Sequence, residues 1–399
     1  MKKSMLCVVV PLLLACVFSV RADNWIYDST AKTLTRGTVV LQNVTANGTN
    51  LTIGVNFPNT TATDLDFSVP IDGGWTITSI STASFGRNPN HGQPQEYNPT
   101  PTNLVLPATL TFLGNHAFRA CTNLTCEIGL MPSNLSCGTT SYGVFYFCSK
   151  LHGSIVIPKG WTLTSGNFTG TGIQSVIFEE GATSMTDGFG TDTVGGKTSL
   201  TNLYLPSTLK TLGSKTARNC TLLDFDVANF PQNLTSIGDY AFEAATNVHG
   251  DLAWPTNSLA APQLLFSKTA IRSVTAKHGL KTIATGAFAS TALEKVVLSY
   301  ETDTIHVNAF GSSFPAKFHE LYFRNCPTNT SIADLGTLRG KMSASFTNYV
   351  FRGDAAWVAF AADPNNQFSL PTTQGLGHWG SSVVKYWHEP MGGLVFIVR

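Results

Sequence analysis

Two stretches of the chain share one frame: Leu113-Gly-Asn-His-Ala-Phe118-Arg-Ala-Cys121-Thr-Asn-Leu124 and Ile237-Gly-Asp-Tyr-Ala-Phe242-Glu-Ala-Ala245-Thr-Asn-Val248. A shorter copy ends at Leu293, and a further copy has Ala217 where the others have phenylalanine. Successive positions of this aromatic slot are 27, 23, 21, 28, 25, 24, 22 and 22 residues apart: Phe118, Phe145, Phe168, Phe189, Ala217, Phe242, Phe266, Phe288 and Phe310. This approximate period predicts stacked units and not one globular core.

Each unit also carries a second pattern, in which apolar residues stand at the first, fourth and sixth positions. Leu200-Thr-Asn-Leu203-Tyr-Leu205-Pro206 is one example, and Phe318-His-Glu-Leu321-Tyr-Phe323 is another. The alternation at the end of the pattern has the period of a strand, and the proline or glycine that often follows would stop it. A single unit cannot bury these side chains. Stacked units can bury them in columns and form a parallel sheet.

The expected fold is therefore a leucine-rich-repeat solenoid that is mainly β, with short turns or single helical turns, and capped at both ends. The repeats would span residues 61–325, between an N-terminal cap at 23–60 and a C-terminal cap at 326–399. The period is lost after about residue 328, and the stretch from Asp354 to Pro364 has helix-like spacing, an acidic start and a proline stop. A solenoid needs such a segment to cover its last exposed core.

The repeated block resembles the BspA-like leucine-rich repeats of secreted and surface proteins in bacteria and protists. The resemblance rests on the Ile-Gly-x-x-Ala-Phe-x-x-Cys-x-x-Leu pattern followed by Val-x-Ile-Pro. It is clearest at residues 104–124 and 234–300. It implies ligand binding or adhesion at the cell exterior, and it carries over no catalytic residue.

The first 22 residues predict a secretory signal peptide. Met1-Lys2-Lys3 is followed by an apolar run to Val20, and the small residues Val20 and Ala22 place cleavage after Ala22. A retained membrane anchor is the alternative, but the run is shorter than the roughly 20 residues of a spanning helix, and Pro11 interrupts it. We expect a mature protein with no membrane span, secreted or associated with the cell surface.

Charge and composition narrow the partners. Only 12% of the residues are charged and the formal net charge is +1, so neither nucleic acid nor an acidic membrane is favoured. The nine histidines have no metal-ligand spacing, and no cofactor motif is present, so we expect neither a metal nor a cofactor. The expected partner is a protein or a glycan at a cell surface.

Ten Asn-x-Ser/Thr triplets suggest N-glycosylation in a eukaryotic host. Asn219 is the least favourable, because it is next to Cys220 in an inward-facing column. The candidates are Asn43, Asn47, Asn50, Asn59, Asn123, Asn134, Asn167, Asn233 and Asn329.

Six cysteines remain after removal of the signal peptide, an even number in an oxidising compartment. Cys121 and Cys148 occupy the same slot of successive units, and rungs about 5 Å apart are within disulfide reach. We therefore predict that Cys121, Cys126, Cys137 and Cys148 form a local disulfide cluster. The alternative is that this slot simply holds small buried residues, which suits Cys, Ala and Thr equally.

The strand position between two inward residues faces outward, and it forms a row along the stack. This row is the natural ligand surface of a solenoid. The candidate contact residues are Ile177, Tyr204, Asp226, Thr275, Val297 and Tyr322.

No motif of a serine hydrolase, metalloprotease, phosphate-binding loop or dinucleotide site is present, so we expect no enzyme. Two alternatives remain open. Carboxylates on a parallel β-solenoid can serve polysaccharide-acting enzymes. A glycosylated structural or decoy coat protein would depend on its glycans and not on the outward row.

Overall fold

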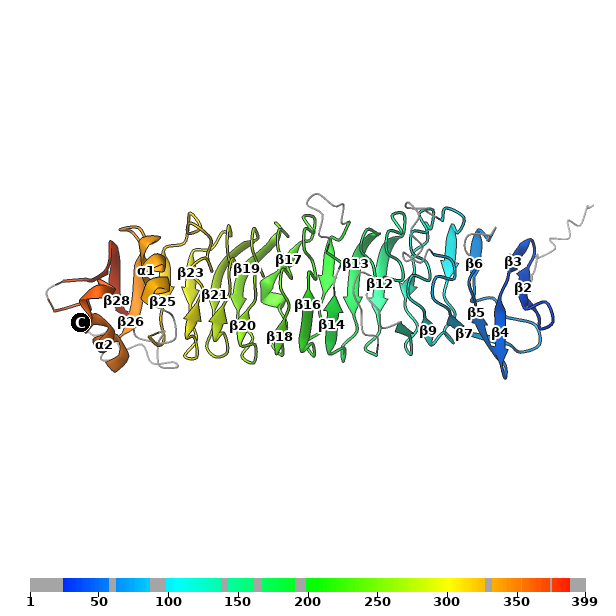
Figure 1. Cartoon of the computed structure of the whole chain (residues 1–399), viewed down its shortest axis with the longest axis horizontal. Coiled ribbons are helices and arrows are strands. Elements are labelled where there is room, and N and C mark those ends of the chain that lie inside the picture. The colour runs from blue at the N-terminus through cyan, green and yellow to red at the C-terminus, as the bar shows by residue number, and fades with distance from the viewer. Residues whose placement is uncertain are drawn as a thin grey trace, which may run out of the picture.

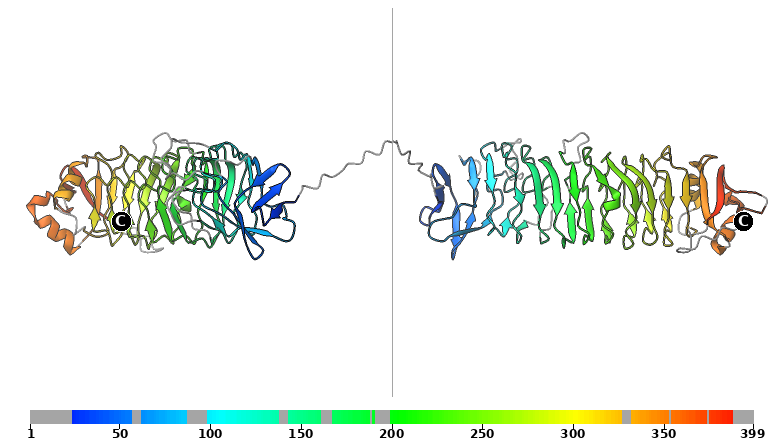
Figure 2. Two further views of the ribbon diagram at one scale, coloured as in Figure 1. Left: turned by 45° about the vertical axis from the view of Figure 1, so that its right-hand side comes forward. Right: turned by 180° about the vertical axis from the view of Figure 1, so that it is seen from behind.

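The chain forms an elongated rod in which short strands stack along one axis (Figure 1). This computed structural model describes residues 24–56, 62–86, 98–137, 143–160, 167–187, 189–190, 199–326, 332–352, 354–373 and 375–387. The predicted signal peptide lies outside the described residues. The N-terminal hairpins lie at one end of the rod and the two helices at the other, and the view from behind shows the same order (Figure 2). The predicted β-solenoid is thus confirmed.

Each turn of the solenoid contributes one strand to each of two sheet faces. We call them face A, formed by the first strand of each unit, and face B, formed by the second. Face A begins with a two-stranded sheet, β6 (Asp64–Asp66) and β8 (Asn103–Val105). A four-stranded sheet follows: β10 (Gly129–Leu130), β12 (His152–Ile157), β13 (Gly172–Phe178) and β15 (Asn202–Tyr204).

The longest sheet of face A has eight strands, of which all neighbours but the last pair are parallel. In spatial order they are β17 (Phe225–Asp226), β19 (Val248–Ala253), β21 (Ala270–Thr275), β23 (Lys295–Val297), β25 (Glu320–Tyr322), β26 (Thr347–Phe351), β28 (Ser382–Trp387) and β27 (Gly377–Trp379).

Face B consists of three smaller sheets. The first contains β11 (Ser136–Cys137), β9 (Phe112–Leu113), β7 (Thr76–Ile80), β5 (Asn50–Ile53) and β4 (Val44–Asn47). The others are β14 (Ser184–Asp187), β16 (Thr211–Ser214) and β18 (Ser236–Ile237), and then β20 (Ala260–Ala261), β22 (Thr282–Ile283) and β24 (Thr304–Ile305).

The phenylalanines of the repeat stack inside the rod as a column of nearly parallel rings. Phe118 is 5.3 Å from Phe85 and 5.4 Å from Phe145, between ring centroids, with interplanar angles of 5°. Offset stacking at this distance matches the separation of successive rungs, so one ring per unit builds a continuous hydrophobic column. The column explains why the aromatic slot recurs through the sequence.

The segment that carries each phenylalanine is a turn, not a helix. Residues four apart on either side of the ring adopt left-handed backbone, as at His116 and Ala120, and at Tyr240 and Ala244. Most non-glycine residues avoid this region, so a helical turn is replaced by two tight reversals that point the ring inward. Of the two forms expected from the sequence, the coil is the one present.

Both ends of the repeats are closed by additional elements. At the N-terminal end, β1 (Ile26–Asp28), β2 (Thr33–Arg36) and β3 (Val39–Leu41) form an antiparallel sheet. The C-terminal end has α1 (Ile332–Gly340) and α2 (Ala355–Ala362), the latter capped by the Asp354 carboxylate. The short 3-10 helix η3 (Pro364–Asn366) follows α2.

The C-terminal segment is tied to the last repeat by one ammonium group. Lys341 Nζ donates to Val307 O at 2.6 Å, Asn308 Oδ1 at 2.7 Å and Gly311 O at 2.8 Å. Burial lowers the pKa of Lys341. The three oxygen acceptors satisfy an amine that would otherwise be costly to place there.

Candidate functional site

The predicted outward row lies along face A. Tyr204 is paired with Ile177, and both are exposed, by 57% and 37%. Asp226 and Thr275 are also exposed, and Tyr322 is half-buried. The pairing of β21, β23 and β25 aligns Thr275, Val297 and Tyr322 on successive strands. The structure therefore brings these positions into a row along one face.

Val297 is the exception, because it is only 5% exposed and cannot offer a contact surface. Tyr322 lies directly beside it on the next strand. Arg324 then crosses the same rung, since its Nε donates to the carbonyl of Ala276 at 3.3 Å. The prediction that Val297 is an outward contact residue is wrong, because larger neighbours cover a short side chain.

The row ends in an aromatic and cationic cluster, which we call the C-terminal patch. It consists of Tyr322, Tyr349, Trp387, Lys295 and Arg324. The rings of Tyr322 and Tyr349 stack at 4.0 Å, and Trp387 packs edge-on against Tyr322 at 5.1 Å. Lys295 lies 4.4 Å above Tyr322 and Arg324 lies 4.9 Å above Trp387. These distances are within cation–π range.

Sequence reasoning missed most of this patch. Tyr349 and Trp387 lie on β26 and β28, in the segment expected to be a separate cap, yet both strands extend the sheet of face A. Alternation of buried and exposed residues in Thr347–Phe351 was the available signal. Burial, followed by the neighbouring Tyr349, raises the pKa of Tyr322 well above its usual range.

Face A is interrupted between β15 and β17, at the unit that has alanine in the aromatic slot. Phe266 stacks on one side of the Phe242 ring at 5.4 Å, and Phe225 stacks on the other at 5.6 Å. Phe225 thus takes the place in the column that a ring at Ala217 would occupy. The chain then leaves the strand direction in the 3-10 helix η2 (Val227–Asn229), and no strand pairing joins β15 to β17 within the described residues.

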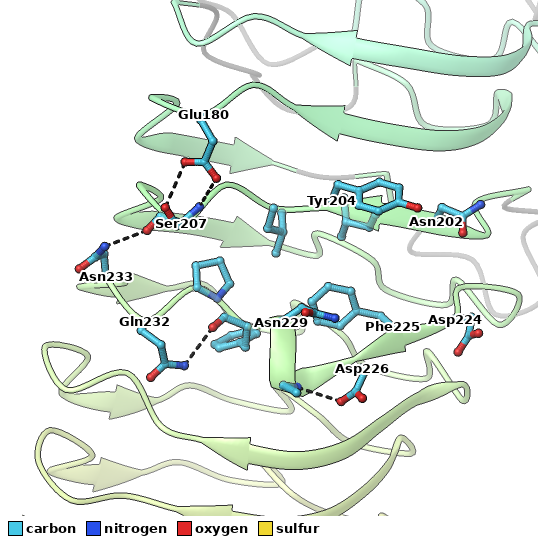
Figure 3. Close-up of a pocket in the computed structure, with 15 residues that line it drawn as sticks. Glu180, Asn202, Tyr204, Ser207, Asp224, Phe225, Asp226, Asn229, Gln232 and Asn233 are labelled. Atoms are coloured by element: carbon cyan, nitrogen blue, oxygen red, sulfur yellow. Dashed lines mark hydrogen bonds between the residues drawn. The ribbon is translucent and has the colours of Figure 1, made fainter.

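A cavity of about 490 Å³ opens at this interruption. Figure 3 shows Tyr204 and Asn202 on β15 facing Phe225, Asp226 and Asn229 across the gap. The volume is within the roughly 300–1,000 Å³ that is typical of small-ligand sites. Two of the predicted contact residues, Tyr204 and Asp226, therefore line one cavity on face A.

Hydrogen bonds hold the wall of this cavity in place. Ser207 donates to both oxygens of Glu180, from its N–H at 2.9 Å and its hydroxyl at 3.1 Å. Asn233 Nδ2 donates to Ser207 O at 2.8 Å, and Gln232 Nε2 donates to Ala253 O at 3.1 Å. Asp226 accepts from Ala228 N–H at 2.9 Å and so caps η2.

The cysteines of the inward column are free thiols. Cys148 Sγ donates to Phe118 O at 2.9 Å, and the Cys121 thiol reaches Phe85 O at 3.7 Å, each on an earlier turn. Cys121, Cys126 and Cys148 are all unbridged, so the predicted disulfide cluster is not present among them. The thiols point to backbone carbonyls and not to each other. The side chain of Cys137 lies outside the described residues.

Burial governs the chemistry of these thiols. It raises the pKa of Cys121 well above its usual range, with a further contribution from the adjacent Cys148 thiol. The pKa of Cys126 is raised by burial as well. Elsewhere in the chain, burial and then the Asp354 carboxylate raise the pKa of Cys326 to about 12. Neutral buried thiols are poor nucleophiles and poor metal ligands.

Most of the predicted glycosylation positions in the described residues are on the surface. Asn43, Asn47, Asn50, Asn134 and Asn233 are exposed, and Asn123 is half-buried. Asn167 is only 3% exposed, and its side-chain oxygen accepts from Val144 N–H at 3.1 Å, so the prediction of a glycan there is wrong. Asn219 is buried, as expected. Asn59 and Asn329 lie outside the described residues.

Two searches of the described part of the chain gave no candidate. No group of three or more histidine, cysteine, aspartate or glutamate residues there could hold a metal ion. No helix in those residues is long and apolar enough to span a bilayer.

Comparison with known proteins identifies the repeats. The model of the BspA type leucine-rich repeat region matches residues 97–193 and 195–317 in six copies. These segments make up more than half of the chain, and the protein belongs to this family. No curated protein is significantly similar to it.

Several solved bacterial structures are also similar to this chain. A leucine-rich repeat protein from Bacteroides ovatus is 17% identical, with coverage of 88% of this chain and all of that one, and a TM-score of 0.40. A leucine-rich cell surface protein from Faecalibacterium prausnitzii is 14% identical, with coverage of 73% and 88%, and a TM-score of 0.35. The pneumococcal vaccine antigen PcpA is 15% identical, with coverage of 81% and 99%, and a TM-score of 0.28.

Proposed function

We propose that this protein is an exported, non-enzymatic binding protein that recognises a protein or glycan partner at a cell surface through the outward side of face A. The export rests on the predicted signal peptide. The binding role rests on the repeat family and on the row of exposed side chains that the parallel strands align. A rigid stack of strands presents such a row without the entropic cost of ordering loops.

The observation that carries the proposal is the C-terminal patch. Tyrosine, tryptophan and arginine are the residues that dominate binding energy in protein interfaces. Here Tyr322, Tyr349 and Trp387 are half-buried and held against one another, so a partner would not have to pay for fixing their rotamers. Arg324 is fixed by its bond to Ala276 O and lies over the Trp387 ring.

The test uses the mature chain, residues 23–399, on arrays of cell-surface proteins and of glycans. Any partner found is then measured against Tyr322→Ala and Tyr349→Ala, which we expect to weaken binding at least tenfold. Tyr146→Ala is the matched control, because Tyr146 also lies under a cation, with Arg119 5.2 Å above its ring, but on a turn away from face A. Equal affinities for all variants would contradict the proposal.

A polysaccharide-acting enzyme is the second candidate, and the carboxylates beside the cavity are the observation in its favour. Glu180, Asp224 and Asp226 line it together. However, both oxygens of Glu180 accept from Ser207, and Asp226 caps η2, so these groups already have structural roles. Release of reducing ends from a polysaccharide panel, lost in Glu180→Gln and Asp226→Asn, would favour the enzyme.

The coat-protein alternative predicts a different dependence. A protein that works through its glycans should lose its interactions when they are removed. A solenoid that binds through face A should keep them, because the exposed triplets at Asn43, Asn47 and Asn50 lie on β4, β5 and the turns beside them, not on face A. Enzymatic deglycosylation followed by the same array separates the two.

A further inference from the structure

The cavity between β15 and β17 combines an exposed aromatic ring with amide and carboxylate groups. We propose that it binds a neutral carbohydrate, with a sugar ring stacked on Tyr204 and its hydroxyls bonded to Asn202, Asn229 and Asp226. This inference deepens the proposed function and rests on it, because it names a ligand class for one site on face A. The cavity is separate from the C-terminal patch, so the two can fail independently.

The aromatic wall provides the first argument. Tyr204 is 57% exposed although it is a large ring on a sheet, and in the described part of the chain its hydroxyl makes no hydrogen bond. An amphipathic ring of this kind offers an apolar surface and a polar tip at one edge of the cavity. A pyranose has the complementary form, with a C–H face that packs on a ring and hydroxyls around its rim.

The polar groups provide the second argument. Asn202 and Asn229 are primary amides, each with two donor hydrogens and one acceptor oxygen. Adjacent hydroxyls of a sugar both donate and accept, so an amide can bond to two of them at once. The Asn229 side chain makes no hydrogen bond within the described residues and is free to take this role.

The charge of the cavity selects neutral sugars. Its lining contains Glu180, Asp224 and Asp226, and none of its fifteen residues is lysine, arginine or histidine. A sialylated, sulfated or phosphorylated ligand would bring a negative charge against these carboxylates without a cation to pair it, which is unfavourable. A neutral sugar uses the same carboxylate oxygens as hydrogen-bond acceptors.

The site is preformed in the unliganded chain. Asp226 is fixed by the N–H of Ala228, and its position depends on a glycine on the next strand. Gly250 has a φ of +105°, and a Cβ there would stand 2.4 Å from Asp226 Oδ1. Any other residue at position 250 would therefore displace this carboxylate and strain the backbone. Preorganised polar groups keep the cost of ordering low when a weakly bound ligand such as a sugar arrives.

The experiment begins with a glycan array probed with the mature chain, followed by titration calorimetry with the neutral oligosaccharides that bind. We expect Tyr204→Ala to weaken affinity about tenfold, Asn229→Ala to weaken it by a similar factor, and Tyr204→Phe to stay within about threefold. Leu222→Ala is the control, since Leu222 is 56% exposed in the same unit but outside the cavity. Chelation of divalent ions should change nothing.

The outcomes separate the two proposals. Sugar binding lost in Tyr204→Ala but kept in Tyr322→Ala supports the site. Binding of a protein partner without any neutral glycan overturns this inference and leaves the proposed function standing. Preference for acidic glycans or for peptides, or sugar binding indifferent to Tyr204, also overturns it. Circular dichroism of each variant confirms that the surface substitutions leave the fold intact.

Discussion

The two halves of the solenoid keep the same core in different ways. From Phe85 to Phe189 the rings stack 5.3–5.5 Å apart, while face A consists of separate two- and four-stranded sheets. From Phe242 to Phe310 the last two ring separations widen to 6.2 Å, while face A becomes one eight-stranded sheet.

Unit length accounts for much of this difference. The spacings of the aromatic slot vary from 21 to 28 residues before Phe242 and only from 22 to 24 after it. Units of nearly equal length keep successive strands in register, so their hydrogen bonds continue from turn to turn. Where unit lengths differ, strand pairing breaks and the ring column is what still joins neighbouring units.

The largest expected effect comes from removing a ring in each half. Phe145→Ala and Phe288→Ala each delete a fully buried ring with neighbours on both sides, which costs about 3–5 kcal/mol of unfolding free energy. We expect Phe145→Ala to be at the upper end, because its ring is packed more closely and less sheet supports it. Urea unfolding followed by circular dichroism measures both. A larger loss for Phe288→Ala would contradict the comparison.

The boundary between the halves offers an intermediate effect. Ala217→Phe alone should cost about 1–3 kcal/mol, because the Phe225 ring already occupies that place in the column. Combined with Phe225→Ala, it should cost less than the sum of the two single changes, by about 0.5–3 kcal/mol. A double-mutant cycle in urea provides the measurement. Strict additivity would show that the two rings do not compete for one space.

The smallest effect is a pH dependence in the N-terminal half. Burial, followed by the nearby Arg119 guanidinium, lowers the pKa of His116 from 6.5 to about 4. The unfolded chain therefore binds this proton first, and stability should fall as the pH drops from 6.5 to 4 and level off below that. His116→Asn, which suits the left-handed backbone at this position, should flatten the slope in melting temperature. His152→Asn, at an exposed position, is the control and should keep the slope.

The repeated aromatic slot was sufficient to predict the solenoid and its inward columns. Periodicity reports which side chains must be buried together, and stacking is the one way that units of this size can bury them. The outward row followed from the alternation of the strands, and it held for Tyr204 and Asp226. The same pattern showed Ala217 as an irregular position, although not its consequence.

Only the tertiary structure decided which outward positions form sites. Val297 is covered because Arg324 reaches across its rung, a contact between residues 27 positions apart that no local pattern contains. The Cys121 and Cys148 thiols turn to carbonyls of other turns, and Asn167 is drawn inward by Val144. The cavity at Tyr204 exists because a ring from position 225 replaced the one missing at 217. Such exchanges depend on three-dimensional packing, and a one-dimensional repeat cannot record them.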